Sequence, residues 1–361
     1  MSTLKTNAIR HISATSDAIT LASDGTATAK ITNRSNPNIL INGQFDIWQR
    51  ATDSGSVTTT GYTGADRWRI NASGATYQFS RQAFTEGQTD VPSYPKYYAR
   101  LAVTTGANNC YIGQRIEDVR SVQGEVPLSF WCNGTNPGGG HLDIDTRQEF
   151  GSGGSTDVQT VIDSLTLTGS WVKKTVTFTP GSLSGKTVGA SSDADDTYFQ
   201  IDIKQPNDDN TTSAWTLDIA NIQLEVGNSA SDYNVISYGD ELARCQRYYQ
   251  TIVKGNGSNL QVFNIGDWYA TSQLNINVPL KVTMRAKPSI HQSEASNWCG
   301  WYGNGASGNI SPAWTEWNSP DSGNMLGAYL DPDTDGTAGT AARVYLSNTD
   351  SGKFLAVTAE L

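Results

Sequence analysis

The stretch that decides the fold reads Trp215-Thr-Leu-Asp-Ile-Ala-Asn-Ile-Gln-Leu-Glu-Val226. It alternates apolar and polar residues with a period of two, which is typical of a β-strand with one buried face and one face in water. An earlier stretch, Trp171-Val-Lys-Lys-Thr-Val-Thr-Phe-Thr179, alternates in the same way, and Gly, Ser, Asp and Thr are frequent between the two. The two stretches predict strands of a sandwich of antiparallel sheets joined by polar loops. The apolar stretch Asn38–Arg50 is predicted to open this sandwich with a buried strand.

Composition favours an all-β protein with more than one domain. The chain has 361 residues, of which 35 are glycine, and only 17% are charged. Long helices need many Leu, Glu, Lys and Ala residues at helical spacing, and such runs are scarce here. A chain of this length is expected to divide into about two or three domains.

The sequence divides into four predicted segments. Residues 1–36 are interpreted as an N-terminal β arm for attachment and oligomerisation, 37–228 as a jelly-roll β-sandwich, 229–250 as a short helical linker and 251–361 as a C-terminal β-sandwich-like head. The arm contains the turn pair Asp24-Gly25 but too few apolar residues for its own core. We therefore expect it to pack on a symmetry mate or on a particle, with an unpacked tail as the alternative.

A helix is predicted over residues 241–250, with Asp240 as its cap. Leu242, Cys245 and Tyr249 fall on one stripe of this helix. A helix of about two to three turns is not stable alone in water, so it must pack against the sandwich or against its copies in an oligomer. The three residues are therefore candidate oligomerisation contacts.

Ten tryptophans are available for packing or binding. Five of them lie inside strand patterns and are predicted to belong to the core: Trp48, Trp68, Trp131, Trp171 and Trp215. A second aromatic group lies in predicted loops of the last segment: Trp298, Trp301, Tyr302, Trp314 and Trp317. Flat rings of this kind can pack against the C–H face of a pyranose, so the second group is a candidate glycan platform. The alternative is that these rings pack against one another or fill a trimer interface.

The stretch Asp331-Pro-Asp-Thr-Asp-Gly336 reads D-x-D-x-D-G, like the first half of a calcium-binding loop. The carboxylates of Asp331, Asp333 and Asp335 are the hard oxygen ligands that Ca²⁺ prefers. However, Ala342 stands where the full loop needs a glutamate. A non-standard Ca²⁺ site and a plain acidic turn both stay open, and no other cofactor is expected.

Charge and cysteine pattern argue against several classes of function. The net charge of -10 and the lack of a basic run argue against a nucleic-acid partner. The four cysteines contain no C-x-x-C pair, so they are predicted to be free buried thiols rather than zinc ligands. The N-terminus has no apolar signal core, and no run approaches the roughly 18 apolar residues of a membrane span. We expect neither export by a signal peptide nor membrane insertion.

The sequence contains no catalytic motif that we recognise. His11, His141 and His291 lie far apart in the sequence, and no nucleophile elbow, metalloprotease, P-loop or dinucleotide motif is present. The short repeats of a parallel β-helix are also missing. We therefore expect a protein that is not an enzyme, although a pair of carboxylates alone would suffice for a glycoside hydrolase.

Several stretches resemble phage virion proteins of the tail-fibre type. They are Asn38-Ile-Leu-Ile-Asn-Gly-Gln-Phe-Asp-Ile-Trp-Gln-Arg50, Ala65-Asp-Arg-Trp68 and Glu241-Leu-Ala-Arg-Cys-Gln-Arg-Tyr-Tyr249, with Leu4–Arg10 and Ser16–Gly25 similar to the front of such fibres. The pair of alternating stretches at 171–179 and 215–226 resembles the closing half of the jelly-roll in carbohydrate-binding modules. The resemblance implies a homotrimer on the virion, with residues 1–36 toward other virion proteins and the C-terminal segment toward the host.

These observations predict a structural protein of a phage particle that adheres to host-surface glycans through several weak sites. Two alternatives stay open. One is a purely structural collar, head-fibre or connector component without a receptor of its own. The other is a hydrolase of capsule polysaccharide.

Overall fold

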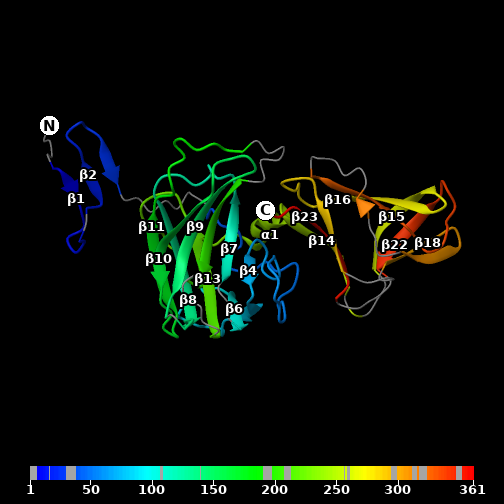
Figure 1. Cartoon of the computed structure of the whole chain (residues 1–361), viewed down its shortest axis with the longest axis horizontal. Helices are drawn as coiled ribbons and strands as arrows, with labels where there is room; N and C mark the ends of the chain where they lie inside the picture. The colour runs from blue at the N-terminus through cyan, green and yellow to red at the C-terminus, as the bar shows by residue number, and fades with distance from the viewer. Residues whose placement is uncertain are drawn as a thin grey trace. The chain divides into compact units, whose positions relative to one another are not determined.

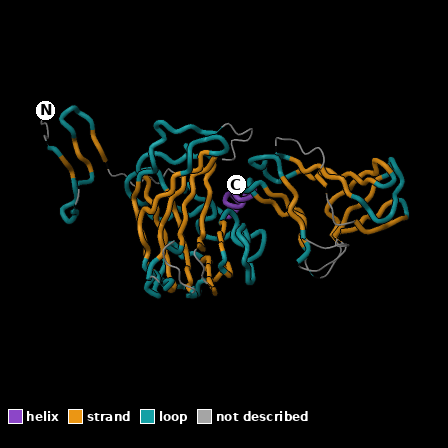
Figure 2. The backbone as a smooth tube through the Cα atoms, viewed as in Figure 1, coloured by secondary structure: helices purple, strands orange, loops and turns teal. Residues whose placement is uncertain are grey.

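The computed structural model describes residues 6–15, 17–29, 38–105, 109–138, 140–189, 197–206, 213–255, 257, 261–293, 299–310, 315–316, 323–346 and 352–361. Within them the chain is almost entirely β, and every strand pairs with its neighbours in the antiparallel sense (Figure 1). The helix found there is α1 (Tyr238–Gln246), drawn in purple in Figure 2. The predicted all-β fold is confirmed.

The chain forms two compact units. The first contains Met1–Asp46 and Ala51–Ile236, and the second contains Ile47–Arg50 and Ser237–Leu361. The chain therefore enters the second unit for one short segment before it completes the first. The four functional segments predicted from the sequence stay predictions.

The N-terminal arm is a small three-stranded sheet made of β1 (Ala8–Ile9), β2 (Ile19–Leu21) and β3 (Ala27–Ala29). The turn between β2 and β3 contains Asp24 and Gly25, as the sequence predicts, and Gly25 has a φ of 86°. The Asp24 carboxylate accepts hydrogen bonds from the Thr26 hydroxyl at 2.7 Å and the Thr26 amide at 2.9 Å, which lower the pKa of Asp24. Ile12 is 96% exposed, so the arm leaves apolar surface uncovered.

Two five-stranded sheets make the sandwich of the first unit. The first has the order β10-β9-β12-β7-β4, and its strands are β4 (Arg69–Ser73), β7 (Asn109–Glu117), β9 (Leu142–Phe150), β10 (Val158–Leu165) and β12 (Thr197–Lys204). The second has the order β11-β8-β13-β6-β5, and its strands are β5 (Thr76–Ala83), β6 (Tyr97–Thr105), β8 (Val126–Thr135), β11 (Val172–Phe178) and β13 (Trp215–Leu224). Most connections cross from one sheet to the other, which gives the jelly-roll predicted from the sequence.

The stretch with which the sequence analysis began forms β13, the central strand of its sheet. Its apolar residues Trp215, Leu217 and Ile219 are buried, as predicted. The predicted face in water is not found, because Asp218 and Gln223 are also buried, at 2% and 1% exposure. Stacked rings of Phe178 and Phe199, 6.3 Å apart, join the two sheets inside the core. Of the five tryptophans predicted for the core, Trp48, Trp68 and Trp215 are buried, whereas the prediction is wrong for Trp131 and Trp171, which are only half-buried.

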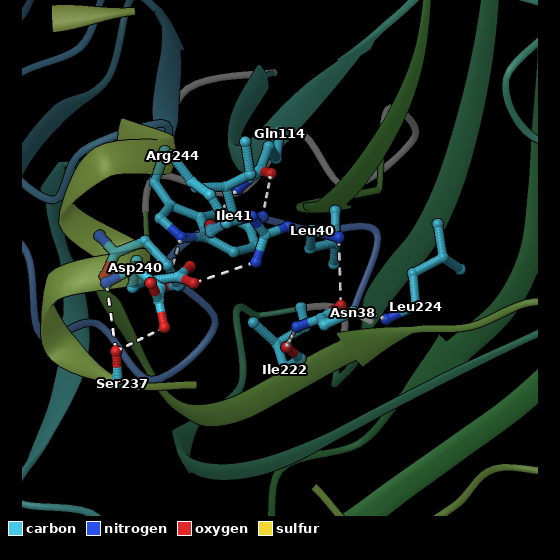
Figure 3. Close-up of polar contacts among 12 residues, drawn as sticks. Asn38, Leu40, Ile41, Gln114, Ile222, Leu224, Ser237, Asp240 and Arg244 are labelled. Atoms are coloured by element: carbon cyan, nitrogen blue, oxygen red, sulfur yellow. Dashed lines mark hydrogen bonds and ion pairs between the residues drawn. The ribbon is translucent and has the colours of Figure 1, made fainter. Parts of the chain in front are cut away.

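The sequence predicts a buried strand over Asn38–Arg50, and this prediction is wrong. The segment is largely buried, but it forms turns rather than a strand. Its Asn38 amide donates to the Ile222 carbonyl at 2.8 Å, and its Asn38 Oδ1 accepts from the Leu224 amide at 2.9 Å (Figure 3). The Ile39 amide also donates to the Leu224 carbonyl at 2.9 Å, and the Gly43 carbonyl accepts from the Ile222 amide at 2.9 Å. The segment therefore meets the backbone of β13 through its own backbone and through the Asn38 side chain.

A second side chain holds the same segment from the opposite sheet. Gln114 of β7 accepts a hydrogen bond from the Ile41 amide at 2.7 Å and donates to the Ile41 carbonyl at 2.8 Å (Figure 3). Asn42 and Phe45 have φ values of 60° and 59°, so the chain turns sharply at both residues. The turns bury Phe45 completely, and the segment contacts one strand of each sheet, β13 and β7.

The second unit contains a three-stranded and a seven-stranded sheet. The smaller has the order β14-β23-β17, from β14 (Tyr249–Lys254), β17 (Ser289–Gln292) and β23 (Phe354–Thr358). The larger has the order β19-β18-β22-β15-β16-β21-β20, from β15 (Gln261–Ala270), β16 (Gln273–Pro279), β18 (Cys299–Gly303), β19 (Ala306–Ile310), β20 (Thr315–Glu316), β21 (Met325–Leu330) and β22 (Ala341–Leu346). Both sheets contribute to one hydrophobic core, which agrees with the predicted β-sandwich-like fold of this part of the chain.

Helix α1 begins earlier and ends earlier than the sequence predicts. Ser237, not Asp240, is the cap: its hydroxyl accepts from the Asp240 amide at 3.2 Å and donates to the Asp240 carboxylate at 2.7 Å (Figure 3). The helix ends at Gln246, because Tyr249 already pairs with β23 as the first residue of β14. Backbone pairing with a sheet replaces the last predicted helical turn.

The predicted oligomerisation stripe is wrong for two of its three residues, because both are buried. Cys245 is 0% exposed and Tyr249 is 1% exposed, so neither offers a surface to another copy. The Tyr249 hydroxyl lies 3.0 Å from His291 Nδ1, so its hydrogen-bond partner belongs to the second unit. Leu242 is half-buried, and its role stays a prediction.

The short segment Ile47–Arg50 is part of the second unit through specific contacts. The Arg50 guanidinium lies 3.6 Å from the Tyr249 ring centroid and 3.0 Å from the Glu360 carboxylate. Side chains of Arg50 and Glu360 are only 8% and 7% exposed. The Lys254 ammonium donates to the Arg50 carbonyl at 2.9 Å, so the segment is fixed at both its backbone and its side chain.

Substitution of Gly43 tests how closely the turn segment packs against β13. A Cβ at residue 43 would lie 2.2 Å from the Ile222 carbonyl oxygen, whereas a Cβ at Gly61 would have nothing within 4 Å. Gly43→Ala is expected to lower the free energy of unfolding by about 2 kcal/mol or more, and Gly61→Ala to change it by less than about 0.5 kcal/mol. Denaturant unfolding followed by tryptophan fluorescence measures both, and equal midpoints for the two variants would contradict the assignment.

Substitution of Arg50 tests the segment in the second unit. Arg50→Met keeps the aliphatic stem but removes the cation beside the buried Glu360 carboxylate, so we expect a loss of about 3 kcal/mol in unfolding free energy. Arg120→Met is the control, because the Arg120 side chain is 59% exposed and its pair with Asp118 is solvated. Thermal unfolding should show a lower midpoint for the first variant and the parent midpoint for the second.

Candidate functional site

Two residues of the predicted aromatic platform, Trp301 and Tyr302, are neighbours on β18 and face opposite sides of the sheet. Trp301 is 1% exposed and packs edge-on against Trp268, with ring centroids 4.7 Å apart, whereas Tyr302 is 51% exposed. Neighbouring residues of a strand face opposite sides, so only one of the two can lie on the surface. The prediction of a surface site is therefore wrong for Trp301. Trp298, Trp314 and Trp317 lie outside the described residues.

Strand register places new neighbours beside Tyr302. Tyr302 pairs with Arg343 of β22, and Arg343 pairs with Ile265 of β15. The next outward residue of β22 is Tyr345, which pairs with Val262 on the side of β15. Three of these side chains are well exposed: Ile265 at 70%, Val262 at 56% and Tyr302 at 51%. We call the surface formed by Tyr302, Arg343, Tyr345, Val262 and Ile265 the tyrosine face.

A β-bulge brings both aliphatic residues to this face. The pairing of β15 with β22 shifts between Val262 and Asn264, so that Phe263 is the extra residue. Without the bulge, Val262 and Ile265 would face opposite sides, since they are three positions apart. Phe263 instead packs against the core of the second unit.

Gly300 shapes the aromatic part of the tyrosine face. Gly300 lies between Tyr345 on one side and Asn309 on the other in the ladder. A Cβ at Gly300 would lie 3.0 Å from three atoms of the Tyr345 phenol, so the phenol occupies the place of a side chain. The sequence analysis missed Tyr345. The alternation of apolar Ala342, Val344 and Leu346 around it could have marked it as outward-facing.

The chemistry of this surface suits a ring-shaped polar ligand. Phenol rings can cover the C–H face of a pyranose, while the Arg343 guanidinium offers hydrogen-bond donors to hydroxyl oxygens. The surface lies on strands rather than on loops, so its side chains are held by the ladder. The arrangement can bind, but it places no nucleophile or carboxylate pair in a position to react.

The predicted calcium loop does not gather its ligands. Asp331, Asp333 and Asp335 are all exposed, and the described residues include no group of three or more His, Cys, Asp or Glu placed to hold a metal. The reason lies in Asp333, whose Oδ1 accepts from the Asn309 amide at 2.8 Å and from the Thr334 hydroxyl at 3.2 Å. These contacts use Asp333 to fix the turn against β19, which favours the plain acidic turn over the Ca²⁺ site.

The described cysteines are buried free thiols, as predicted: Cys110, Cys132, Cys245 and Cys299. Burial raises the pKa of Cys110 and of Cys132 to about 12, and it also raises the pKa of Cys299. Thiols with such pKa values stay protonated at neutral pH and act as apolar packing groups.

In the described part of the chain, the helix is too short to cross a bilayer.

A buried carboxylate pair lies in the sandwich. Asp145 of β9 and Asp202 of β12 are register partners, with exposed fractions of 0% and 1%. The Lys204 ammonium lies 2.5 Å from Asp145, and the Gln200 amide donates to both oxygens of Asp202 at 2.7 and 2.8 Å. A Cβ at Gly113 would collide with Asp202, so this glycine makes room for the carboxyl group.

Burial raises the pKa of Asp202 to about 7. The negative charge of Asp145 also raises it, whereas the hydrogen bond from Gln200 and the charges of Lys204 and Arg115 lower it. A carboxyl group that is half-protonated near neutral pH resembles a general acid in its titration. Its burial, however, keeps it away from a polymeric substrate.

Comparisons with known proteins give structural similarities at low TM-scores and no sequence relative. No family model and no curated protein matches this chain. A family 11 carbohydrate-binding module from Clostridium thermocellum is 16% identical, with a TM-score of 0.30, over 50% of this chain and 98% of the module. A xylan-binding domain from Paenibacillus barcinonensis is 14% identical, with a TM-score of 0.32, over 55% of this chain and 99% of that domain. The enzymatically active domain of tailspike protein 4 from bacteriophage CBA120 is 10% identical, with a TM-score of 0.30, over 52% of this chain and 21% of that chain. Similarities this low carry no argument about ligand or activity, which must come from the residues of this chain.

The titration of Asp202 predicts how stability depends on pH. Its folded-state pKa of about 7 lies above the ordinary value of 3.8, so the folded state binds a proton that the unfolded state has lost. The free energy of unfolding is therefore expected to fall as pH rises from about 4 to about 7, by up to roughly 4 kcal/mol. Asp202→Asn removes this loss, so the variant should be the more stable protein at about pH 8.

Asp118→Asn is the matched control for this experiment. Arg120 lowers the pKa of Asp118, so its titration lies below the range studied, and the variant should keep the pH slope of the parent. Urea unfolding of the three proteins at about pH 5 and pH 8 gives the comparison. Parallel pH slopes for the parent and Asp202→Asn would contradict the prediction.

Proposed function

We propose that this protein is a virion subunit of a phage appendage of the tail-fibre type, and that it adheres to host-surface glycans without catalysing a reaction. The observation that carries this proposal is the tyrosine face, where two tyrosines and an arginine lie beside exposed aliphatic side chains on one side of a rigid sheet. Apolar surface of this kind is costly to leave in water and marks an interaction site.

The proposed mechanism is avidity. A shallow face with few hydrogen-bonding groups is expected to bind weakly, and a Kd near 1 mM corresponds to only about 4 kcal/mol. Copies of the chain in a homotrimer, repeated on a particle, would multiply this affinity without new contacts. Residues 1–36 are the proposed contact with other virion proteins, which is supported by Ile9 and Ile12 at 49% and 96% exposure in the arm.

The alternative of a purely structural component shares the same surface. In that case, a second copy of the chain would cover the tyrosine face, and no glycan would bind there. Hydrolysis is supported by one observation, the Asp145 and Asp202 pair, and opposed by the near-complete burial of both carboxyl groups. An assay for reducing ends released from capsule polysaccharide tests it, and release abolished by Asp202→Asn would favour the hydrolase.

Replacement of the tyrosines tests the proposed function. Tyr302→Ala and Tyr345→Ala remove one ring each from the tyrosine face, and each is expected to weaken glycan binding by about three- to tenfold. Tyr269→Ala is the control, because Tyr269 is 69% exposed but lies at the hairpin end of β15, away from Tyr302. A glycan array probed with the full-length protein identifies the ligand, and titration calorimetry gives the Kd of each variant.

Two results would contradict the proposal. One is glycan binding that is unchanged in both tyrosine variants. The other is a native mass that drops to that of a monomer in Ile265→Asp, with no glycan bound by the parent, since this would identify the face as an interface between copies.

A further inference from the structure

The β5–β6 hairpin of the first unit contains a pocket. Its volume is about 510 Å³, and it is lined by residues 83–88 and 94–96. This volume falls within the range of about 300–1,000 Å³ that is usual for small-molecule sites. None of the lining residues belongs to the tyrosine face or to any motif identified in the sequence.

The loop that forms the pocket is held in one conformation. The Phe84 amide donates to the Lys96 carbonyl at 3.0 Å and closes the hairpin. Farther along, the Gln88 amide group donates to the Val91 carbonyl and accepts from the Val91 amide, each at 2.9 Å. Val91 itself is fully buried, so it anchors the loop in the core. A pocket built this way exists before a ligand arrives, which reduces the entropic cost of binding.

Aromatic rings form the apolar wall of the pocket. Phe84 packs against Tyr98 and Trp171, with ring centroids 4.8 and 5.1 Å away, so its ring is fixed from behind. Tyr94 is 72% exposed and has a φ of 47°, next to Ser93 with a φ of 67°. Two successive non-glycine residues in the left-handed region are unfavourable, and such strain is found where a side chain must be presented in a fixed direction.

Polar groups around these rings are available to a ligand. The side chains of Thr85, Glu86 and Lys96 line the pocket, and none of them has a hydrogen-bond partner in the described part of the chain. The Lys96 ammonium lies 5.1 Å from the centroid of the Tyr97 ring, a contact that leaves its hydrogen-bond donors available. The Glu86 carboxylate can only accept hydrogen bonds at neutral pH, and the Lys96 ammonium can only donate them. One negative and one positive group in the same pocket favour a ligand without net charge that carries both donors and acceptors.

We propose that this pocket binds one neutral pyranose unit of a glycan, as a second carbohydrate site independent of the tyrosine face. A hydroxyl group both donates and accepts, so adjacent hydroxyls can satisfy Glu86 and Lys96 together. The C–H face of the ring packs against Tyr94 and Phe84. An acidic sugar brings a negative charge that Lys96 attracts and Glu86 repels, so it gains no net attraction while its carboxylate loses hydration, and it is expected to bind more weakly.

The test uses the full-length protein with cellobiose, maltose and lactose as neutral probes and glucuronic acid as the acidic probe. Binding is measured by saturation-transfer NMR and by titration calorimetry. We expect at least one disaccharide to bind with a Kd below about 10 mM and glucuronic acid to bind at least several-fold more weakly. Tyr94→Ala should weaken the disaccharide by about tenfold and Glu86→Gln by about fivefold.

Tyr238→Ala is the matched control, because Tyr238 is 62% exposed and lies outside the pocket. It should leave the disaccharide Kd unchanged, and circular dichroism should show the parent spectrum for every variant. The proposal is overturned if none of the three disaccharides binds at about 10 mM, or if the one that binds is insensitive to Tyr94→Ala.

The outcome for this pocket is separable from the outcome for the proposed function. Tyr302→Ala changes the tyrosine face and should not alter the disaccharide Kd at the hairpin pocket. A loss of disaccharide binding in Tyr302→Ala with no loss in Tyr94→Ala would assign the ligand to the tyrosine face and refute the second site.

Discussion

The fold depends on the hydrogen bonds that residues 38–43 make with an irregular part of β13. The ladder between β13 and β8 shifts between Ala220 and Gln223, and Asn221 within this bulge has a φ of 50°. Asn38 and the backbone of Gly43 supply partners there: the Ile222 amide donates to the Gly43 carbonyl at 2.9 Å, and the Ile222 carbonyl accepts from Asn38. Buried backbone groups without partners would cost the fold several kcal/mol, so this segment is required wherever β13 carries the bulge. Because the chain continues directly from this segment into Ile47–Arg50, one stretch of sequence completes both units.

Regular strands could be predicted from the sequence, whereas the packed turns and the helix-to-strand junction could not. Alternation identified β13 and β11, because each repeats the pattern over several residues. It failed at Asn38–Arg50, where apolar residues are also frequent but lie in turns that side-chain and backbone hydrogen bonds hold. The pattern of apolar and polar residues indicates which residues are buried, and burial alone does not distinguish a strand from a packed turn. The same limit explains α1, where the stripe of Cys245 and Tyr249 marked burial correctly but not the change from helix to strand between them.

The candidate site shows why register matters more than composition. Tyr302 was predicted from its surroundings, and Tyr345 and Ile265 were not, although the three lie on neighbouring strands. Their meeting depends on two features that a single sequence does not reveal. One is the pairing of β22 with both β15 and β18, which joins residues far apart in the chain. The other is the bulge at Phe263, which reverses the alternation that the sequence pattern implies. Trp301 was misplaced for the opposite reason, because its strand neighbour Tyr302 takes the outward position.

The two proposed sites differ in how much water a bound sugar displaces, and this difference determines which ligands each site can distinguish. On the tyrosine face the side chains stand on an open sheet, so a bound sugar keeps one side hydrated and loses little on dissociation. In the hairpin pocket, Glu86 and Lys96 flank fixed rings, and a ligand must replace the water on both charged groups. A hydroxyl in the wrong position would leave one of these charges without a partner, which costs more than a missing apolar contact. The pocket is therefore the place where this chain can discriminate between sugars, and the open face is where many copies can add affinity with little discrimination.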